Sequence, residues 1–305
     1  MFFWNETIFA SFRASGDTKT PTIVSSIAVL FNMVLDPLFI FGYGPFPELG
    51  VAGASTATAV SVLIGMILIT ALLLKGKLGY SVNHLLKIKP KLKELWKIGK
   101  IGLPMSTQQL VFVIVYWFLI KIVHSFGETS AAAMGIGNRM ESFSYLTCFG
   151  FSLAASTLVG QNLGAGKPER AAKCAYGSIG MAVSLTLVMT FLFIVFPKYI
   201  AGIFTDDAEV LAIAVDYLVI LGISQFAMAI EIVLEGSFSG AGNTIPPMVV
   251  MIPGSLARIP LAYYLCFNLG WGINGVWWTL TITTLVKSMI LFYWFRLGHW
   301  KLKEV

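Results

Sequence analysis

Long apolar runs, each about the length needed to cross a lipid bilayer as a helix, recur along the whole of this chain. We place eight of them, at residues 21–42, 51–74, 101–124, 130–161, 172–197, 208–238, 247–268 and 273–296. About twenty apolar residues in helical form span a hydrocarbon core of roughly 30 Å. Because the runs do not alternate between polar and apolar residues, they favour helices over barrel strands. The sequence therefore predicts an all-α, polytopic membrane protein.

The overall composition agrees with membrane insertion. Hydrophobic residues make up 57% of the chain and charged residues only 12%, whereas about a quarter of the residues in soluble domains are charged. Residues 1–12 have neither the basic start nor the small-residue cleavage site of a signal peptide. We expect them to form the second half of a further helix, which gives about eight full spans and a partial one.

A short motif occurs twice, roughly 220 residues apart, and each time it links two apolar runs. Residues 11–21 read SFRASGDTKTP, and residues 237–247 read SFSGAGNTIPP, so that Gly16 pairs with Gly242. Each copy is followed by an apolar run, a glycine-containing turn and a second apolar run. Duplicated halves in a membrane protein point to a secondary transporter whose substrate path lies between the repeats.

Lysine and arginine residues are concentrated in alternate connections between the runs, and this bias sets orientation in a membrane. If the eight spans alternate, one side carries the repeat motifs, the Lys-rich linker at 76–100 and the C-terminus, and we predict that this side is cytoplasmic. The basic residues there are Arg13, Lys19, Lys75, Lys77, Lys87, Lys89, Lys91, Lys93, Lys97, Lys100, Lys167, Arg170, Lys173, Arg296, Lys301 and Lys303.

Four motifs together resemble the multidrug and toxic compound extrusion (MATE) family. They are the segments Gly16 to Pro21, Asn32 to Pro37, Val159 to Gly166 and Gly240 to Thr244. The resemblance implies twelve helices arranged in two six-helix lobes as an inverted V around a central cleft. It also implies export of organic cations and other amphipathic compounds, driven by an inward flow of protons or sodium.

The same resemblance implies how the chain is divided. Residues 1–75 would be the C-terminal remnant of the N-lobe, with the end of helix 4 and helices 5 and 6. Residues 76–100 would be a cytoplasmic linker, and residues 101–305 a complete C-lobe with helices 7 to 12. The protein would then be a multi-pass protein of the cytoplasmic membrane with a cytoplasmic C-terminus.

Asp36 is the strongest candidate for cation coupling, because an ionised carboxylate at the membrane centre costs about 3 kcal/mol or more. Asn32 lies one helical turn earlier on the same face. The resemblance assigns this pair, together with Thr58 on the next span, to a polar site that binds or relays the coupling cation. The alternative is that Asp36, which precedes Pro37, caps or kinks a helix near the outer surface.

Further ionisable residues in the second half are candidates for the substrate cleft. Glu231 and Glu235 lie four apart and share a helix face, and Glu235 lies near enough to the cytoplasmic end that it could simply reach water. Arg139 and Glu141 occur at a depth where charges are costly unless they face a watery cleft or a partner. Because two positions separate them, they point to different faces. We nominate Glu231, Glu141 and Arg139 as cleft residues.

We therefore expect a cation-coupled antiporter that works by alternating access on small amphipathic or cationic substrates within membrane lipid. No catalytic array, metal-ligand spacing, nucleotide motif or nucleic-acid-binding pattern stands out, so we predict no enzyme activity, no cofactor beyond the coupling proton or sodium, and no nucleic-acid partner. Two alternatives stay open. One is a lipid-linked saccharide flippase, and the other is a non-transporting fragment.

Overall fold

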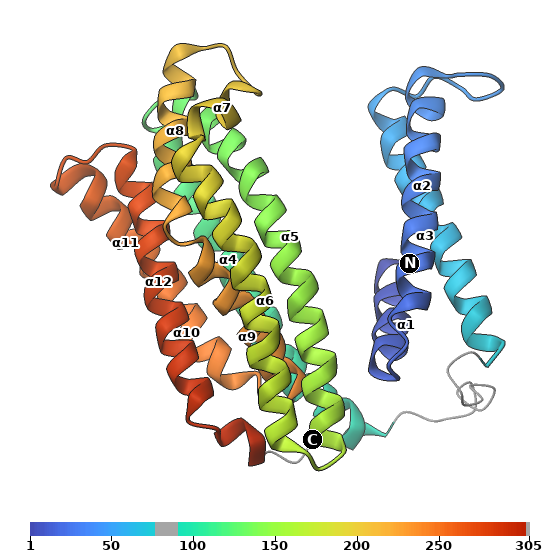
Figure 1. The fold of residues 1–305 in the computed structure, drawn as a ribbon. Coiled ribbons are helices and arrows are strands. Elements are labelled where there is room, and N and C mark those ends of the chain that lie inside the picture. The colour runs from blue at the N-terminus through green and yellow to red at the C-terminus, as the bar shows by residue number, and fades with distance from the viewer. Residues whose placement is uncertain (77–90, 303–305) are drawn as a thin grey trace. The chain divides into compact units, whose positions relative to one another are not determined.

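The computed structural model describes residues 1–76 and 91–302, which form two compact units, Met1–Lys91 and Leu92–Val305. Every regular element in the described ranges is helical, which confirms the all-α prediction (Figure 1). By length and composition, seven helices of the described residues could cross a membrane, and the bent pair Ala208–Gly222 and Gln225–Gly240 makes an eighth when it is counted as one span. Each of the eight predicted apolar runs corresponds to one of these helices or to the bent pair.

The Met1–Lys91 unit consists of α1 (Phe2–Ala14), α2 (Lys19–Phe41) and α3 (Val51–Leu74). Helices α2 and α3 pack against each other as an antiparallel hairpin, and the close approach depends on Gly53, where a Cβ would overlap the backbone of Phe39. A small apolar core joins α1 to both, made of Ile8, Phe9, Phe12, Val24 and Ile69.

The Leu92–Val305 unit begins with helix rather than with linker. Helix α4 spans Leu92–His124 and so starts nine residues before the predicted apolar run at 101. Leucine and lysine are good helix formers, so the basic segment before the span continues the helix. The lysines at 77, 87 and 89, and Lys303 at the other end of the chain, lie outside the described residues.

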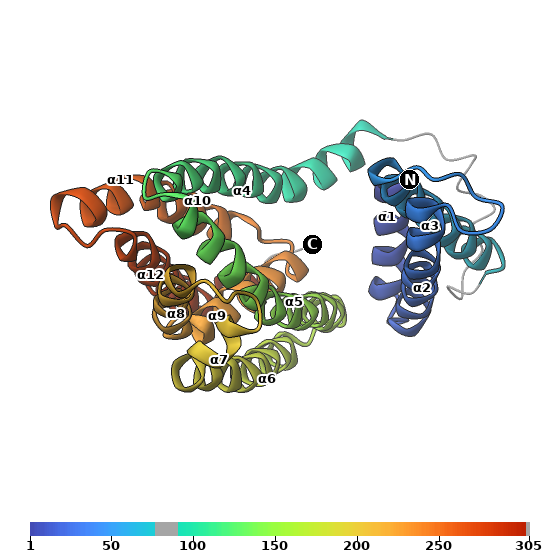
Figure 2. The ribbon, with the colours of Figure 1, turned by 90° about the horizontal axis from the view of Figure 1, so that it is seen from above.

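Helix α9 lies at the centre of this second unit. It packs against α5, α6 and α12, whereas α4 packs mainly on α10 and α11 (Figure 2). The remaining elements in chain order are α5 (Glu128–Gly164), α6 (Pro168–Val195), α7 (Pro197–Gly202), α8 (Ala208–Gly222), α9 (Gln225–Gly240), α10 (Ile245–Leu256), α11 (Arg258–Tyr263), a π-helical turn (Tyr264–Asn268), α12 (Asn274–Arg296) and a 3-10 turn (His299–Leu302).

The span predicted at 208–238 is not one continuous helix. It bends by 55° between α8 and α9. Backbone groups freed at such a break must find partners inside the protein, because lipid offers none. The hydroxyl of Thr190 donates to the carbonyl of Gly222 at 2.9 Å, and that of Thr281 donates to Ile220 at 2.9 Å. Side chains from α6 and α12 therefore stabilise the bend.

Both copies of the repeated motif fold into the same turn. Gly16 and Gly242 have positive φ values of 90° and 64°, a conformation that glycine adopts without strain. In each copy this glycine and the next residue, Asp17 or Asn243, donate backbone hydrogen bonds of 2.9–3.0 Å to carbonyls three and five positions earlier. This is the Schellman pattern that ends a helix, so the sequence repeat corresponds to a repeat in structure.

Helices α5 and α9 approach each other closely along a row of small residues. A Cβ at Gly236 or Gly240 would overlap the backbone of Ser152 or Ser156 on α5, and one at Gly160 would lie 3.0 Å from the Gly240 carbonyl. Small residues at a spacing of four let helix backbones meet in membranes, where packing rather than hydrophobicity drives association.

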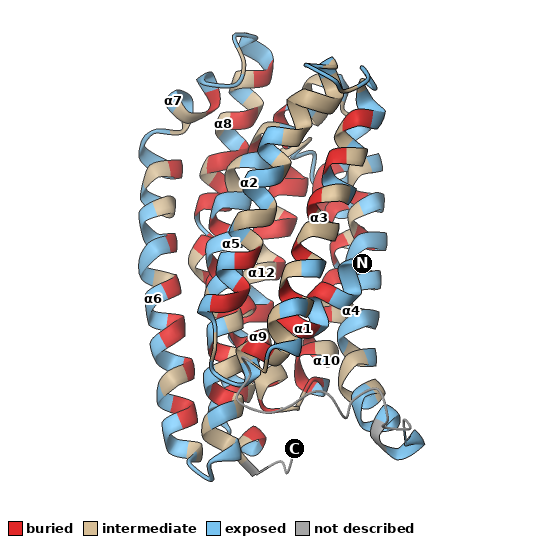
Figure 3. Cartoon of the chain, turned by 90° about the vertical axis from the view of Figure 1, so that its right-hand side faces the viewer, coloured by how far each residue is buried: buried red, intermediate tan, exposed pale blue. Residues whose placement is uncertain are grey.

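The outward faces of the helices remain apolar and exposed. Helix α6, for example, is buried along one side only (Figure 3), and its other side presents Leu185, Val188 and Phe191, each about half exposed. Large exposed apolar surfaces of this kind are what a helix bundle presents to lipid.

Candidate functional site: a charged cavity

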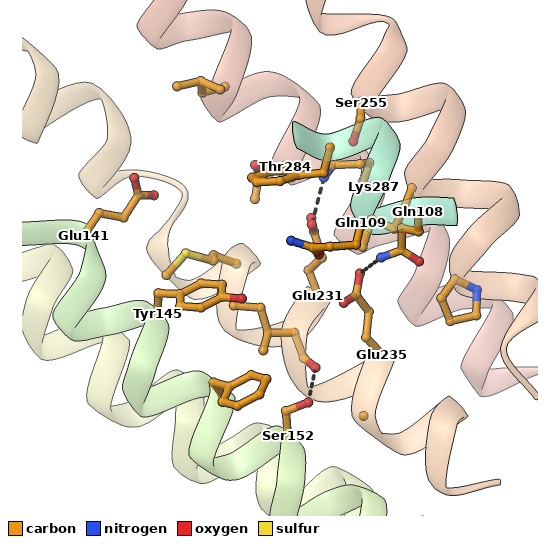
Figure 4. A pocket seen from close by; sticks show the side chains of 18 of the residues that line it. Gln108, Gln109, Glu141, Tyr145, Ser152, Glu231, Glu235, Ser255, Thr284 and Lys287 are labelled. Atoms are coloured by element: carbon orange, nitrogen blue, oxygen red, sulfur yellow. Dashed lines mark hydrogen bonds and ion pairs between the residues drawn. The ribbon is translucent and has the colours of Figure 1, made fainter. Parts of the chain in front are cut away.

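A cavity of about 610 Å³ opens within the Leu92–Val305 unit (Figure 4). Its size falls in the range of about 300–1,000 Å³ that is typical of small-molecule sites. The walls come from α4, α5, α9, α10 and α12, with further residues from α8 and α11. The polar and charged side chains that line it include Gln108, Gln109, Asn138, Glu141, Glu231, Glu235, Arg258 and Lys287.

Glu231 and Lys287 form a buried ion pair on one wall. Lys287 Nζ lies 2.8 Å from Glu231 Oε1. The Lys287 side chain is only 4% exposed and the Glu231 side chain 14%. The stem of Lys287 passes over Gly254, where a Cβ would lie 2.5 Å from its methylene carbons. The second carboxylate oxygen of Glu231 is buried without a hydrogen-bond partner among the described residues.

Glu235 lies one helical turn beyond Glu231 on α9. It accepts a hydrogen bond of 2.7 Å from Gln108 Nε2 on α4, and no cation among the described residues lies within ion-pair distance of it. Figure 4 shows the contact crossing between the two helices. This hydrogen bond links α4, which packs mainly on α10 and α11, to the central helix.

Glu141 occupies the α5 side of the cavity and is held by Tyr217. The hydroxyl oxygen of Tyr217 lies 3.1 Å from Glu141 Oε2 and 3.0 Å from Asn138 Oδ1. The tyrosine ring is buried, packed edge-on against Trp277 with centroids 4.7 Å apart, and it fills the space left by Gly137. The ring is thereby fixed, and its hydroxyl positions the carboxylate.

Arg258 is the second buried cation of the cavity. Its side chain is bonded to α12 through neutral hydroxyls, Nε to Thr283 at 2.9 Å and Nη2 to Thr284 at 3.1 Å. Only 6% of the residue is exposed. No carboxylate in the described ranges lies within ion-pair distance of it.

Aromatic and methionine side chains supply the apolar surface. Phe112 and Tyr116 stack on α4 with centroids 5.9 Å apart, and Tyr145 and Phe149 stack on α5 at 6.3 Å. All four line the cavity, as do Met105, Met228 and Met251. Flat rings of this kind can stack on an aromatic ligand or contact a cation through their faces.

The three residues nominated for cation coupling lie in the Met1–Lys91 unit, and the structure brings two of them together. Asn32 Nδ2 donates to Asp36 Oδ1 at 3.2 Å on α2, and both side chains are half-buried. Thr58 is exposed and donates its hydroxyl to the carbonyl of Ala54 at 3.0 Å. Within residues 1–76 no hydrogen bond joins Thr58 to the pair.

Of the three residues nominated for the cleft, Glu231 and Glu141 line the cavity and Arg139 does not. Arg139 is exposed on α5, two positions from Glu141 and therefore on a different face. Two residues that bond to the carboxylates, Gln108 and Tyr217, were not nominated, nor was Asn138, whose Oδ1 lies 3.0 Å from the Tyr217 hydroxyl. Only Asn138 had a signal in the sequence, since it lies three positions before Glu141 on one helix face.

These features define a polytopic helical membrane protein with a drug-sized, charged and aromatic cavity. In the range 91–302 and in residues 1–76, no cluster of three His, Cys, Asp or Glu side chains could hold a metal ion. The MatE family model matches residues 104–264, which is more than half of the chain and includes most of the cavity walls. The chain belongs to the MatE family.

Individual relatives agree with this assignment. The chain is 30% identical over 297 residues to a probable multidrug resistance protein NorM of Thermotoga maritima, covering 97% of this chain and 64% of that protein. It is 27% identical over 289 residues to a FAD transporter of Shewanella oneidensis, covering 92% and 62%. The chain thus spans less than two thirds of the length of these relatives.

A solved structure with the same fold is a MATE crystal structure in the bent conformation. It superimposes with a TM-score of 0.86 at 23% identity, covering 96% of this chain and 64% of that one. At this identity the likeness establishes the fold.

Proposed function

We propose that the complete protein is a cation-coupled antiporter that exports amphipathic organic compounds across the cytoplasmic membrane by alternating access, and that the cavity binds the exported compound. The observation that carries the proposal is the set of carboxylates, Glu141, Glu231 and Glu235, lining one drug-sized cavity inside apolar helices. Ionisable groups at such depth are costly and are by default functional. The relatives named as multidrug resistance proteins support the same conclusion.

In this proposal the coupling cation, a proton or sodium, binds at the Asn32–Asp36 pair. The amide of Asn32 holds the Asp36 carboxylate at 3.2 Å, and a carboxylate in an apolar helix can take up a cation when water reaches it from one side and release it to the other. The basic residues at the start of α4, in the α5–α6 turn and after α12 support a cytoplasmic C-terminus.

The comparisons do not favour the lipid-linked saccharide flippase that the sequence left open. The charge of the cavity supports the same conclusion, because its three carboxylates outnumber its two cations, Arg258 and Lys287. A sugar pyrophosphate would meet more negative than positive charge there.

Gradient-driven transport of ethidium in sealed vesicles tests the export function. The vesicles would contain either this chain or a version extended to the length of the relatives, with and without a proton or sodium gradient. We expect the extended version to move ethidium only when a gradient is present. Movement that is independent of both gradients, or no movement in the extended version, would contradict the proposal.

Asp36→Asn in the extended version is expected to reduce gradient-driven transport at least about tenfold, because an amide neither takes up a proton nor offers a charge to sodium. The matched control is Glu6→Gln on α1, which removes an exposed carboxylate of the same unit, 3.7 Å from Arg13, and should leave the rate unchanged. Equal rates in the two variants would remove Asp36 from the coupling step.

A further inference from the structure

The first turns of α4 present large apolar side chains that the described protein does not cover. Leu92 is 83% exposed and Trp96 73%, and Leu95 and Leu103 are also exposed. These four residues recur at intervals of three, one and seven positions, which places them on one face of the helix. The apolar face of the span therefore continues, uncovered, to the start of α4.

A stripe of lysines runs beside this apolar face. Lys93, Lys97 and Lys100 are spaced by four and three positions, so they share a second face, and all three are exposed. Lys93 follows Leu92, and Lys97 follows Trp96, by one position, which is about 100° around the helix. The one acidic residue in the sequence of this segment is Glu94. Residues 92–100 thus form a basic amphipathic segment, a type that lies in the membrane interface.

Two exposed tryptophans indicate where α4 meets the edges of the hydrocarbon. Trp96 and Trp117 are 21 positions apart, which at 1.5 Å per residue corresponds to about 31 Å. The hydrocarbon core is about 30 Å thick, and tryptophan is enriched at both of its boundaries. Lys121 Nζ lies 3.6 Å from the centroid of the Trp117 ring, so a cation accompanies the tryptophan at that end too. This spacing puts residues 92–100 at the headgroups of the other leaflet.

The end of the Leu92–Val305 unit at which α4 begins carries further positive charge. The turn between α5 and α6 lies at the same end (Figures 1 and 3). This turn and the first turns of α6 expose Lys167, Arg170 and Lys173. At the other end, the connection before α8 is acidic, with Asp206 and Asp207. A leaflet with a negative surface potential would complement the basic end.

We propose that residues 92–100 are a docking surface for anionic phospholipid. Trp96 and the leucines enter the boundary between headgroups and acyl chains, and the lysine stripe contacts the phosphates and the net negative charge of the headgroups. A lysine near such a surface favours anionic lipid by about fivefold, and its long stem lets the ammonium reach the headgroups while the helix lies deeper. The start of α4 is thereby held by lipid, whichever compound the cavity binds.

Quenching of Trp96 by brominated lipid tests the lipid preference of this surface. The chain is reconstituted in vesicles of phosphatidylcholine and phosphatidylglycerol, with bromine on the acyl chains of one lipid or the other. Trp96→Phe is measured in parallel, and the difference is the signal of Trp96. We expect phosphatidylglycerol to be favoured beside Trp96 at least about fivefold at low salt, and less than about twofold at about 1 M salt, where charges are screened beyond about 3 Å. Equal quenching by both lipids at low salt, or by neither, would overturn the proposal.

Variants of the lysine stripe test whether its charge causes the preference. The triple glutamine variant is Lys93→Gln, Lys97→Gln and Lys100→Gln, each made with and without Trp96→Phe. We expect its preference for phosphatidylglycerol to fall below about twofold. Arginine at the same three positions, Lys93→Arg, Lys97→Arg and Lys100→Arg, keeps the charge and should keep the preference.

The matched control removes three charges from the same end of the unit but from different helices. It is Lys167→Gln, Arg170→Gln and Lys173→Gln. The preference beside Trp96 should stay within about twofold of that of the original chain. Equal loss in the two triple glutamine variants would mean that the general field of the basic end selects the lipid, and would overturn a docking surface at residues 92–100.

Two further measurements separate lipid from free phosphate and give the depth of Trp96. Soluble glycerophosphoglycerol carries the same phosphate without acyl chains, and at constant ionic strength it should not change the quenching. Displacement of the brominated lipid by this soluble compound would overturn the lipid surface. Bromine near the headgroup end of the acyl chain should quench Trp96 more than bromine near the methyl end, and the reverse order would contradict the interfacial position.

Discussion

Replacing Lys287 with methionine is expected to lower the free energy of unfolding by about 3–5 kcal/mol, because the change leaves the Glu231 carboxylate buried without its counter-ion. The pair is 2.8 Å apart and almost wholly shielded from solvent. A loss of this size lowers the unfolding midpoint by on the order of 10 °C in a chain of this length. A thiol-reactive dye that labels Cys148 and Cys266, both buried in the folded chain, measures the midpoint during heating.

Two further variants make the comparison specific. Lys301→Met breaks an ion pair of similar length, 2.9 Å to Glu169, but one whose carboxylate side chain is 80% exposed, so we expect a change below about 1 kcal/mol. The double variant Glu231→Met with Lys287→Met removes both charges. Because the second Glu231 oxygen has no partner to lose, this double variant should regain most of the free energy of unfolding that Lys287→Met alone loses. A double variant no more stable than Lys287→Met would show that lost packing, not the unpaired charge, causes the effect.

The helical spans could be predicted because hydrocarbon leaves the backbone few alternatives to helix. The bend between α8 and α9 could not be predicted from the sequence. Gly222 and Ser224 lie at the break and weaken a helix locally, but the segment includes no proline, so these residues do not by themselves specify a bend of 55°. The bend is stabilised by the hydroxyls of Thr190 and Thr281, which are distant in sequence and become relevant only once the helices have packed.

Of the candidate site, too, only some residues could be predicted from the sequence. Glu141 and Glu231 could be nominated from the cost of charge in a membrane alone, and spacing separated Arg139 from Glu141. The partners of the α9 carboxylates could not be assigned from the sequence, because each lies far away along the chain. Lys287 is 56 positions from Glu231, and Gln108 is 127 positions from Glu235. The partners of Arg258 were equally hidden, because the sequence does not reveal that the hydroxyls of Thr283 and Thr284 hold its guanidinium.

Gly240→Ala is expected to destabilise the chain by about 3 kcal/mol, although it adds a single methyl group. The new Cβ would fall on the backbone carbonyl of Ser156, so α5 and α9 would have to separate, and overpacking of this kind costs about 1–3 kcal/mol. Gly236→Ala meets the backbone of Ser152 one turn away and should cost a similar amount. The same thermal labelling of the buried thiols measures both variants.

Gly150→Ala is the matched control on α5, because a Cβ there meets no atom within 4 Å. Alanine favours helix over glycine by up to about 1 kcal/mol, so this variant should be as stable as the original chain or slightly more so. One separation of α5 from α9 relieves both overlaps, and the double variant at Gly236 and Gly240 should therefore lose less than the sum of the two single losses. Strict additivity would mean that the two overlaps with α5 are relieved independently, and not by one separation of α5 from α9.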